Sequence, residues 1–213
     1  ILISGIFRDD QIFFKWFGQP LQKILHFYQM IFVQDENSFQ LLKENGIVNS
    51  ALSSDTRFDR VLQIKTEAKN FDEVEKFCNG LQVVVCGSTW KEDEQILAIL
   101  QSSRMGLKFI IAPHEINTSH IDFIKSIFKN AICLSEYNFE LQAEVLIIDS
   151  IGMLSKIYRY ATIAYVGGGF NKAGIHNILE AAVYGKVVFW GPNFNRSAEA
   201  SKLIGVGAGY SFE

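Results

Sequence analysis

Three consecutive glycines, Gly167, Gly168 and Gly169, form the segment of this sequence best suited to hold a ligand. They follow residues 162–166, a short run of β-branched and aromatic residues that is typical of a buried strand. Glycine lets the backbone turn sharply and approach a ligand without a Cβ atom in the way. The triplet therefore predicts either a phosphate-binding loop or a tight turn between two elements.

Polar residues follow the glycines where the sequence predicts the start of a helix. His176, Asn177 and Glu180 are expected to share one face of its first turns, because apolar residues recur on the other face. Those apolar residues are Ile175, Ile178, Leu179, Ala182 and Val183. Free N–H groups at a helix start favour a negative charge. We therefore predict a site for an anionic group here, with a solvated helix face as the alternative.

Three other loops come directly after expected strands. Their residues are Ser88 and Thr89 after residues 82–86, Pro113 and His114 after residues 107–112, and Ile151, Gly152 and Met153 after residues 144–148. Strands and helices alternate along the chain, which predicts an α/β fold with parallel sheets covered on both faces. Ligands in such folds lie beyond the carboxyl ends of the strands. We expect the four loops to meet at one sheet edge, with Ser88 or Thr89 also capping the next helix.

The elements fall into two units. We expect residues 1–60 to be the C-terminal part of a first domain, residues 61–80 a connecting helix, and residues 81–213 a second domain. Residues 1–5 are expected to form a buried strand and residues 53–60 a polar loop. Arg57 in that loop would stabilise developing negative charge, or pair with Asp55 or Asp59. Both ends of the sequence fall within strand-like segments, so we interpret the chain as a piece of a longer protein.

Composition narrows the classes of function. The chain has 213 residues, 48% of them hydrophobic, and a formal net charge of −3, which gives no nucleic-acid signature. Its three cysteines form no C-x-x-C pair and its four histidines form no metal-ligand cluster. No apolar run has the length of a transmembrane helix. The aromatic cluster Phe13, Phe14, Trp16 and Phe17 around Lys15 predicts either contact with a membrane interface or packing between helices.

Several of these segments, taken in order, resemble the 3-deoxy-D-manno-octulosonic acid (Kdo) transferases of lipopolysaccharide synthesis. They cover nearly the whole chain and comprise residues 55–59, 87–90, 112–114, 149–152, 167–182 and 185–193. The helix motif alone recurs in many two-domain glycosyltransferases, whereas the ordered set is much more specific. The variant loops resemble the Bacteroidetes branch of the family.

The resemblance implies a GT-B fold, with two Rossmann-like domains of which the first is only partly present here. It implies inverting transfer of Kdo from CMP-Kdo to a lipid A precursor, with no metal or other cofactor. The implied location is the cytoplasmic face of the bacterial inner membrane, where the protein is peripheral or anchored by a segment upstream of Ile1. The implied partners are therefore CMP-Kdo, the lipid A precursor and the membrane surface, with no nucleic acid.

The resemblance also implies roles for individual residues. The residues that match the CMP-holding segment are Asn177, Ile178, Leu179 and Glu180, and Glu180 would accept ribose hydroxyl groups. Two further CMP-contacting loops match Pro113–His114 and Ile151–Met153. Arg57 matches a basic residue that stabilises the transition state.

The sequence departs from the family at two positions, and it does not contain a match to the family's catalytic base. Many relatives have Arg where His114 stands and Glu where Met153 stands, which puts both side-chain roles in doubt. The catalytic base of the family is a glutamate that would lie upstream of Ile1, and an inverting transfer needs such a base. We therefore expect the chain by itself to be inactive in Kdo transfer.

Three other functions are weighed. One is a GT-B glycosyltransferase that uses a UDP- or GDP-sugar. Another is a dinucleotide-dependent oxidoreductase, although the glycine triplet lacks the G-x-G-x-x-G spacing and comes late in its domain. The third is a non-catalytic two-lobed binding protein. Preference among CMP, UMP and GDP would distinguish the glycosyltransferases, and NAD binding would indicate the oxidoreductase. The binding protein predicts a periplasmic export signal upstream.

Overall fold

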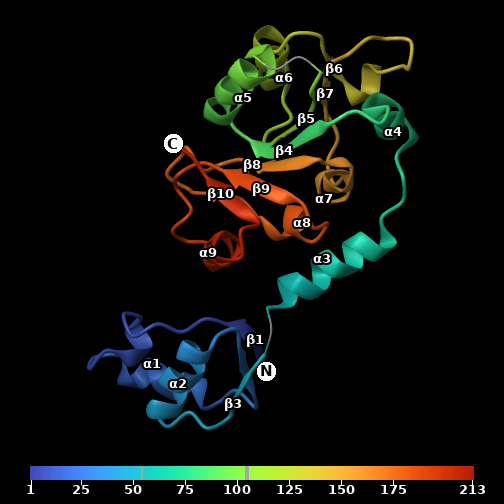
Figure 1. The fold of residues 1–213 in the computed structure, drawn as a ribbon. Coiled ribbons are helices and arrows are strands. Elements are labelled where there is room, and N and C mark those ends of the chain that lie inside the picture. Colours follow the sequence, from blue (N-terminus) through green and yellow to red (C-terminus); the bar gives the residue numbers. More distant parts are fainter. Residues whose placement is uncertain (54, 104–105) are drawn as a thin grey trace. The chain divides into compact units, whose positions relative to one another are not determined.

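A computed structural model describes residues 1–53, 55–103 and 106–213 of the chain (Figure 1). Ser54, which belongs to the expected polar loop, lies outside these residues. The described chain divides into two compact units, Ile1–Arg60 and Val61–Glu213. Each unit is a separate α/β structure with its own parallel sheet.

The first unit is built on a three-stranded parallel sheet in the order β1-β2-β3. Its elements are β1 (Leu2–Gly5), the 3-10 helix η1 (Ile12–Phe14), α1 (Gln19–Leu25), β2 (Ile31–Val33), α2 (Glu36–Glu44) and β3 (Ser50–Leu52). The buried core consists of Phe7, Leu25, Ile31, Val33, Leu42 and Ile47. The expectation of a buried first strand is wrong. Ile1 is 73% exposed and Ile3 is 62% exposed, because alternate side chains of a strand share one face and this face is open to solvent.

The segment after β3 is helical rather than a loop. Helix α3 (Thr56–Glu67) begins inside the expected polar loop and places Arg57 in its first turn. The side chain of Asp55 explains this start, because its Oδ1 accepts a 2.8 Å hydrogen bond from the backbone N–H of Arg57. A second helix, α4 (Asp72–Cys78), follows. Residues 61–80 therefore hold two helices where one was expected.

The second unit contains a seven-stranded parallel sheet in the order β10-β9-β8-β4-β5-β7-β6. Its strands are β4 (Val83–Thr89), β5 (Lys108–Pro113), β6 (Ala131–Cys133), β7 (Val145–Ile147), β8 (Ile163–Val166), β9 (Val187–Trp190) and β10 (Gly209–Ser211). The further helices are α5 (Lys91–Ser103), α6 (Thr118–Ile127), η2 (Leu134–Glu136), α7 (Leu154–Ile157), η3 (Tyr158–Tyr160), α8 (Leu179–Ala182) and α9 (Ala198–Gly205).

Helices cover both faces of this sheet, as the near-continuous apolar strands predict. Alternate residues of β4 show the two faces. Val83 and Val85 belong to a core that includes residues of α4, α7, α8 and α9, whereas Val84 and Cys86 pack with α5 and α6. Figure 1 shows α5 and α6 on the opposite side of the sheet from α7 and α8. The predicted α/β class with parallel sheets is confirmed.

Candidate functional site

The strand order brings the four predicted loops to one edge of the larger sheet. Strands β8, β4, β5 and β7 are neighbours in that order, and all are parallel, so their carboxyl ends lie side by side. Backbone hydrogen bonds join the loops that follow them. The N–H of Gly167 donates to the carbonyl of Gly87, and the N–H of His114 donates to the carbonyl of Thr89, both at 2.9 Å.

The helix after the glycine triplet starts later than expected. Helix α8 begins at Leu179, so His176 and Asn177 lie in the loop before it rather than on its face. Asn177 accounts for this start, because its Oδ1 accepts a 3.1 Å hydrogen bond from the N–H of Leu179. Its Nδ2 donates to Glu180 Oε1 at 3.2 Å. Asn177 and Glu180 therefore form one polar pair, while His176 belongs to a different cluster.

The glycine triplet is required by close backbone packing. Gly168 has φ +91°, and a Cβ on it would lie 2.6 Å from the carbonyl oxygen of Gly174. A Cβ on Gly169 would lie 2.5 Å from the backbone nitrogen of Gly191. These distances are too short for any side chain. The triplet therefore lets the loop after β8 pack against the turn after β9.

Asp93 of α5 connects three of the segments at this edge. Its Oδ2 accepts 2.9 Å hydrogen bonds from the backbone N–H groups of Trp90 and Gly168, and its Oδ1 accepts a 2.5 Å bond from the hydroxyl of Tyr165. Asp93 was not among the predicted site residues, and Ser88 or Thr89 was expected to cap α5. The cap is supplied instead by Asp93, which accepts from the residue before the helix.

A second buried network lies beneath the loop after β4. Glu94 is fully buried and accepts 2.8 Å hydrogen bonds from Thr89 Oγ1 and from His120 Nε2. Burial raises the pKa of the Glu94 carboxyl, although the hydrogen bonds from His120 and Thr89 oppose the shift. The Thr89 hydroxyl is committed to Glu94 and its carbonyl to His114, and the residue is fully buried, so Thr89 holds the loop in place.

Three aromatic rings stack at the same edge. The centroid of the His114 ring lies 4.5 Å from those of Trp90 and His176, with interplanar angles of 27° and 24°. The indole Nε1–H of Trp90 donates a 3.0 Å hydrogen bond to His176 Nε2. Burial lowers the pKa of His176, and the neighbouring His114 lowers it further. Trp90 was not among the predicted site residues.

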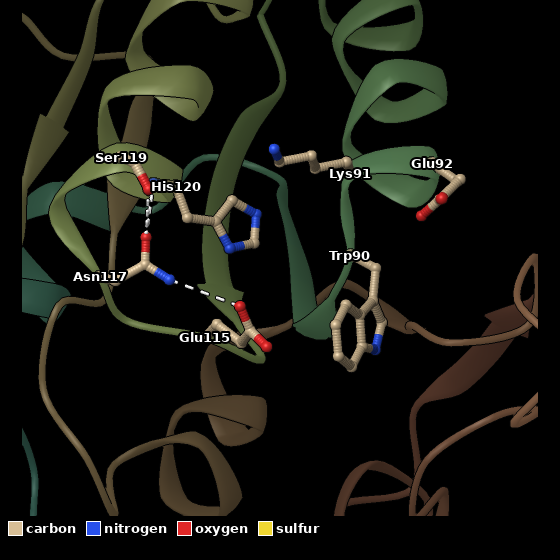
Figure 2. Close-up of a pocket in the computed structure, with 7 residues that line it drawn as sticks. All are labelled: Trp90, Lys91, Glu92, Glu115, Asn117, Ser119 and His120. Carbon is tan, nitrogen blue, oxygen red and sulfur yellow. Dashed lines mark hydrogen bonds between the residues drawn. The ribbon is translucent and has the colours of Figure 1, made fainter.

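A pocket of about 260 Å³ lies beside this stack (Figure 2). Its lining comprises Trp90, Lys91, Glu92, Glu115, Asn117, Ser119 and His120. Asn117, which caps α6, accepts a hydrogen bond from the Ser119 hydroxyl at 2.7 Å and donates to Glu115 at 3.4 Å. An aromatic wall with mixed hydrogen-bond donors and acceptors suits a polar, hydroxyl-bearing ligand.

The remaining predicted residues differ in what they expose at this edge. Ile151 is 94% exposed, and the neighbouring Gly152 has φ +84° with open space around it. Met153 is half-buried, packs against the core and accepts a hydrogen bond from Ser150. Ser88 is half-buried and has φ +53°, at the bulge of β4. Pro113, Ile178 and Leu179 are buried, so their side chains hold the loops in place.

Arg57 is held by its neighbour in the first unit. Its Nη2 lies 2.5 Å from Asp55 Oδ2, and its Nε donates to the same oxygen at 2.7 Å. Burial raises the pKa of the Asp55 carboxyl, but the hydrogen bonds and charge of Arg57 outweigh this and leave the pKa below its ordinary value. The pairing that the sequence offered as one alternative is therefore present.

The aromatic cluster of the first unit divides into two parts. Phe13 and Phe14 are half-buried and pack edge-on against Phe7. Trp16 is 86% exposed, and Phe27 is 85% exposed in the turn after α1. We call the second group the exposed aromatic surface. It comprises Trp16, Phe17, Ile24 and Phe27, together with Lys15 and Lys23, which precede Trp16 and Ile24 in the sequence.

The described residues contain neither a candidate membrane span nor a candidate metal site. Across residues 1–53, 55–103 and 106–213, no helix has the length and apolar character to span a membrane. Within the same ranges, no group of three or more His, Cys, Asp and Glu side chains is placed to hold a metal ion.

Several known proteins are similar in sequence to this chain. No family model matches the chain. The 3-deoxy-D-manno-octulosonic acid transferase of Rickettsia felis is 29% identical over 213 residues, which are 96% of this chain and 46% of that protein. The enzyme of that name from Chlamydophila psittaci is 30% identical over 134 residues, which are 60% of this chain and 31% of that protein. The chain is a relative of the Kdo transferases. It spans about half the length of the curated relatives it matches.

A solved structure agrees with this relationship. The C-terminal CMP-Kdo binding domain of WaaA from Acinetobacter baumannii superimposes with a TM-score of 0.54 and 25% identity. The match covers 73% of this chain and 81% of that domain. The resemblance to Kdo transferases, which are glycosyltransferases, and the GT-B type of α/β fold are therefore confirmed.

Proposed function

We propose that the complete protein is an inverting glycosyltransferase that moves Kdo from CMP-Kdo to a lipid A precursor. The observation that carries this proposal is the meeting of four loops at the carboxyl ends of β8, β4, β5 and β7. This edge belongs to a fold shared with a CMP-Kdo binding domain. The edge would bind the CMP part of the nucleotide sugar, as ligands lie beyond strand ends in α/β sheets.

The pair formed by Asn177 and Glu180 would address the ribose. A carboxylate accepts hydrogen bonds from hydroxyl groups on both its oxygens, and Asn177 holds Glu180 through a 3.2 Å hydrogen bond. The loop that contains Ile151 and Gly152 is exposed, so its backbone groups could contact the cytosine ring of CMP. His114 is exposed where many Kdo transferases carry Arg, so it would supply a weaker contact to negative charge.

Catalysis would also need a group that stabilises negative charge and a general base. We propose that Arg57 stabilises negative charge in the transition state and that its ion pair with Asp55 fixes the guanidinium. The general base would be a glutamate upstream of Ile1. No metal ion or other cofactor is part of this proposal.

The exposed aromatic surface would contact the membrane that holds the acceptor. Aromatic side chains beside cations suit the boundary between lipid head groups and acyl chains. Trp16 and Phe27 expose most of their side chains, and Lys15 and Lys23 lie in the same stretch of sequence. We propose the cytoplasmic face of the bacterial inner membrane as the location.

Nucleotide binding tests the proposal. CMP, UMP, GDP and NAD are titrated into the 213-residue chain and the midpoint of thermal unfolding is followed. A ligand that binds only the folded state stabilises it by about 2.7 kcal/mol at a hundred times its Kd. We expect CMP to stabilise the chain most. A preference for UMP or GDP would support another glycosyltransferase, and stabilisation by NAD alone would support an oxidoreductase.

Activity provides the second test. The complete protein is expected to transfer Kdo from CMP-Kdo to a lipid A precursor, and the 213-residue chain is not. Transfer by the 213-residue chain alone would show that the base lies within it and would overturn its placement upstream.

A further inference from the structure

The hydrogen bond between Trp90 and His176 determines which ring nitrogen of His176 carries the proton. An indole N–H only donates, so the Nε2 atom that it contacts at 3.0 Å must be an acceptor. An imidazole whose Nε2 accepts is neutral and has its proton on Nδ1. The geometry therefore selects one of the three protonation states available to the ring.

The surroundings of His176 favour the same state. The ring is half-buried and stacks at 4.5 Å on His114, which comes from the loop after β5. The other ionisable group that acts on it is Asp93 of α5. Both oxygens of Asp93 already accept hydrogen bonds from Trp90, Gly168 and Tyr165. Burial and His114 lower the pKa of His176, and Asp93 acts in the opposite direction.

We propose that Trp90 is a positioning residue of the nucleotide-sugar site, which acts by holding His176 as the neutral Nδ1–H tautomer. This inference rests on the proposed function of the sheet edge as the binding site for CMP-Kdo. In this state His176 offers one hydrogen-bond donor, at Nδ1, and no positive charge. Trp90 also lines the pocket of Figure 2, so one indole ring contacts both the pocket and His176.

The state of His176 is measured without reference to activity. In the 213-residue chain, nitrogen-15 NMR distinguishes the two neutral tautomers and follows the pKa. Trp90→Phe keeps an aromatic face for stacking on His114 and removes the N–H donor. We expect the wild-type ring to be a single Nδ1–H tautomer, and the variant to show mixed tautomers and a higher pKa.

A matched control removes an aromatic hydrogen-bond donor elsewhere in the second unit. The Tyr210 hydroxyl donates to the carbonyl of Gly207 at 3.3 Å, on an exposed turn. Tyr210→Phe is therefore expected to leave the tautomer and the pKa of His176 unchanged. An unchanged tautomer and pKa in Trp90→Phe would overturn the proposal.

A double-mutant cycle on CMP affinity tests whether Trp90 acts through His176. At pH 7.5, loss of one ordered hydrogen bond is expected to weaken CMP binding by about threefold to tenfold in Trp90→Phe. His176→Phe removes both ring nitrogens, so Trp90→Phe should cause no further loss in that background. Additive losses, or unchanged affinity in Trp90→Phe alone, would overturn the positioning role.

The outcomes also separate the proposal from the function on which it rests. If wild-type protein fails to bind CMP while His176 is the Nδ1–H tautomer, the proposed nucleotide site is wrong and the role of Trp90 in it falls. If CMP binds and the Trp90→Phe variant retains the wild-type tautomer and pKa, the function stands and the role of Trp90 is wrong.

Discussion

The carboxylate of Asp93 on α5 accepts a 2.9 Å hydrogen bond from the backbone N–H of Gly168 in the loop after β8. The two residues are far apart in the sequence, and their strands β4 and β8 are neighbours in the sheet. Asp93 also holds Trp90 and Tyr165. One side chain thus fixes the relative positions of the first and last loops of the proposed nucleotide site.

Replacement of Asp93 should cost stability in proportion to the hydrogen bonds lost. Asp93→Ala leaves three donors without their acceptor, at about 1–3 kcal/mol for each buried group, so we expect a loss of about 3 kcal/mol or more. Asp93→Asn can still accept from both backbone N–H groups and donate to Tyr165, and should lose about 1 kcal/mol. Urea unfolding measures both. Equal losses in the two variants would show that the charge, rather than the hydrogen bonds, is the important feature.

Glu180 should be needed for CMP binding and not for folding. Glu180→Ala removes the acceptor proposed for the ribose hydroxyls, and hydrogen bonds to charged groups contribute about 1.5–3 kcal/mol. Calorimetry should therefore show CMP affinity reduced by at least about tenfold, with a melting temperature near that of the wild type. Asn177→Ala should give a smaller loss. Glu73→Ala removes an exposed acid in the first turn of α4 and serves as the control. Wild-type affinity in Glu180→Ala would return this residue to a solvated surface role.

Alanine at Gly169 should destabilise the second unit. Its Cβ would lie 2.5 Å from the nitrogen of Gly191 and 2.6 Å from its Cα, and backbone atoms cannot move aside as a side chain can. We expect a loss of about 1–3 kcal/mol, typical of an overpacked site. Gly205→Ala is the control, because no atom lies within 4 Å of its added Cβ and alanine suits the end of α9. A stable Gly169→Ala protein would contradict the close approach of the two loops.

His176 should make stability depend on pH. Its pKa is lowered from 6.5 in the folded state, so the unfolded chain binds the proton more readily. The contribution of His176 to the free energy of unfolding is complete above pH 6.5 and is lost as the pH falls from 6.5 through the folded pKa. Burial raises the pKa of Glu94 above 4.5, which gives the opposite trend with pH. The difference between wild type and His176→Phe isolates the histidine, and that difference should shrink on acidification.

The exposed aromatic surface should drive vesicle binding. Trp16→Ser and Phe27→Ser together are expected to weaken binding of the complete protein to vesicles of phosphatidylglycerol and phosphatidylethanolamine, as measured by sedimentation. Val48→Ser serves as the control, since Val48 is 85% exposed in the same unit but lies outside this surface. Addition of salt should weaken binding further, through screening of Lys15 and Lys23. Equal binding by all variants would exclude this surface as the membrane contact.

Local sequence patterns predicted the loops at the sheet edge but not the buried hydrogen bonds that hold these loops in place. The run of strands and the glycine triplet were readable because buried parallel strands are near-continuous apolar segments. Asp93 and Glu94 were not among the predicted site residues, since nothing local shows that their partners Tyr165 and His120 come from other elements. Contacts between distant segments carry no local periodicity.

The predicted starts of two helices differ from the observed starts, also for a physical reason. The spacing of Ile175, Ile178 and Leu179 suits a helix, yet backbone hydrogen bonds hold the loop before Leu179. The N–H of Ile175 donates to the carbonyl of Asn193, and that of His176 donates to the carbonyl of Gly167. At Asp55, the reverse occurred: a capping side chain turned an apparently polar loop into the first turn of α3. In both places tertiary or side-chain hydrogen bonds decided the structure.

The central place of β4 has a consequence for the order in which the chain folds. Strand β4 pairs with β5 after one helix, but its other neighbour is β8, and the pair Val84 and Ile163 lies about 80 residues apart in the sequence. Pairing over such a distance is slow, because the intervening chain must first be closed into a loop. The glycine loop joins Asp93 only after this step. We therefore expect nucleotide binding to appear late in refolding, after β4 and β5 have paired.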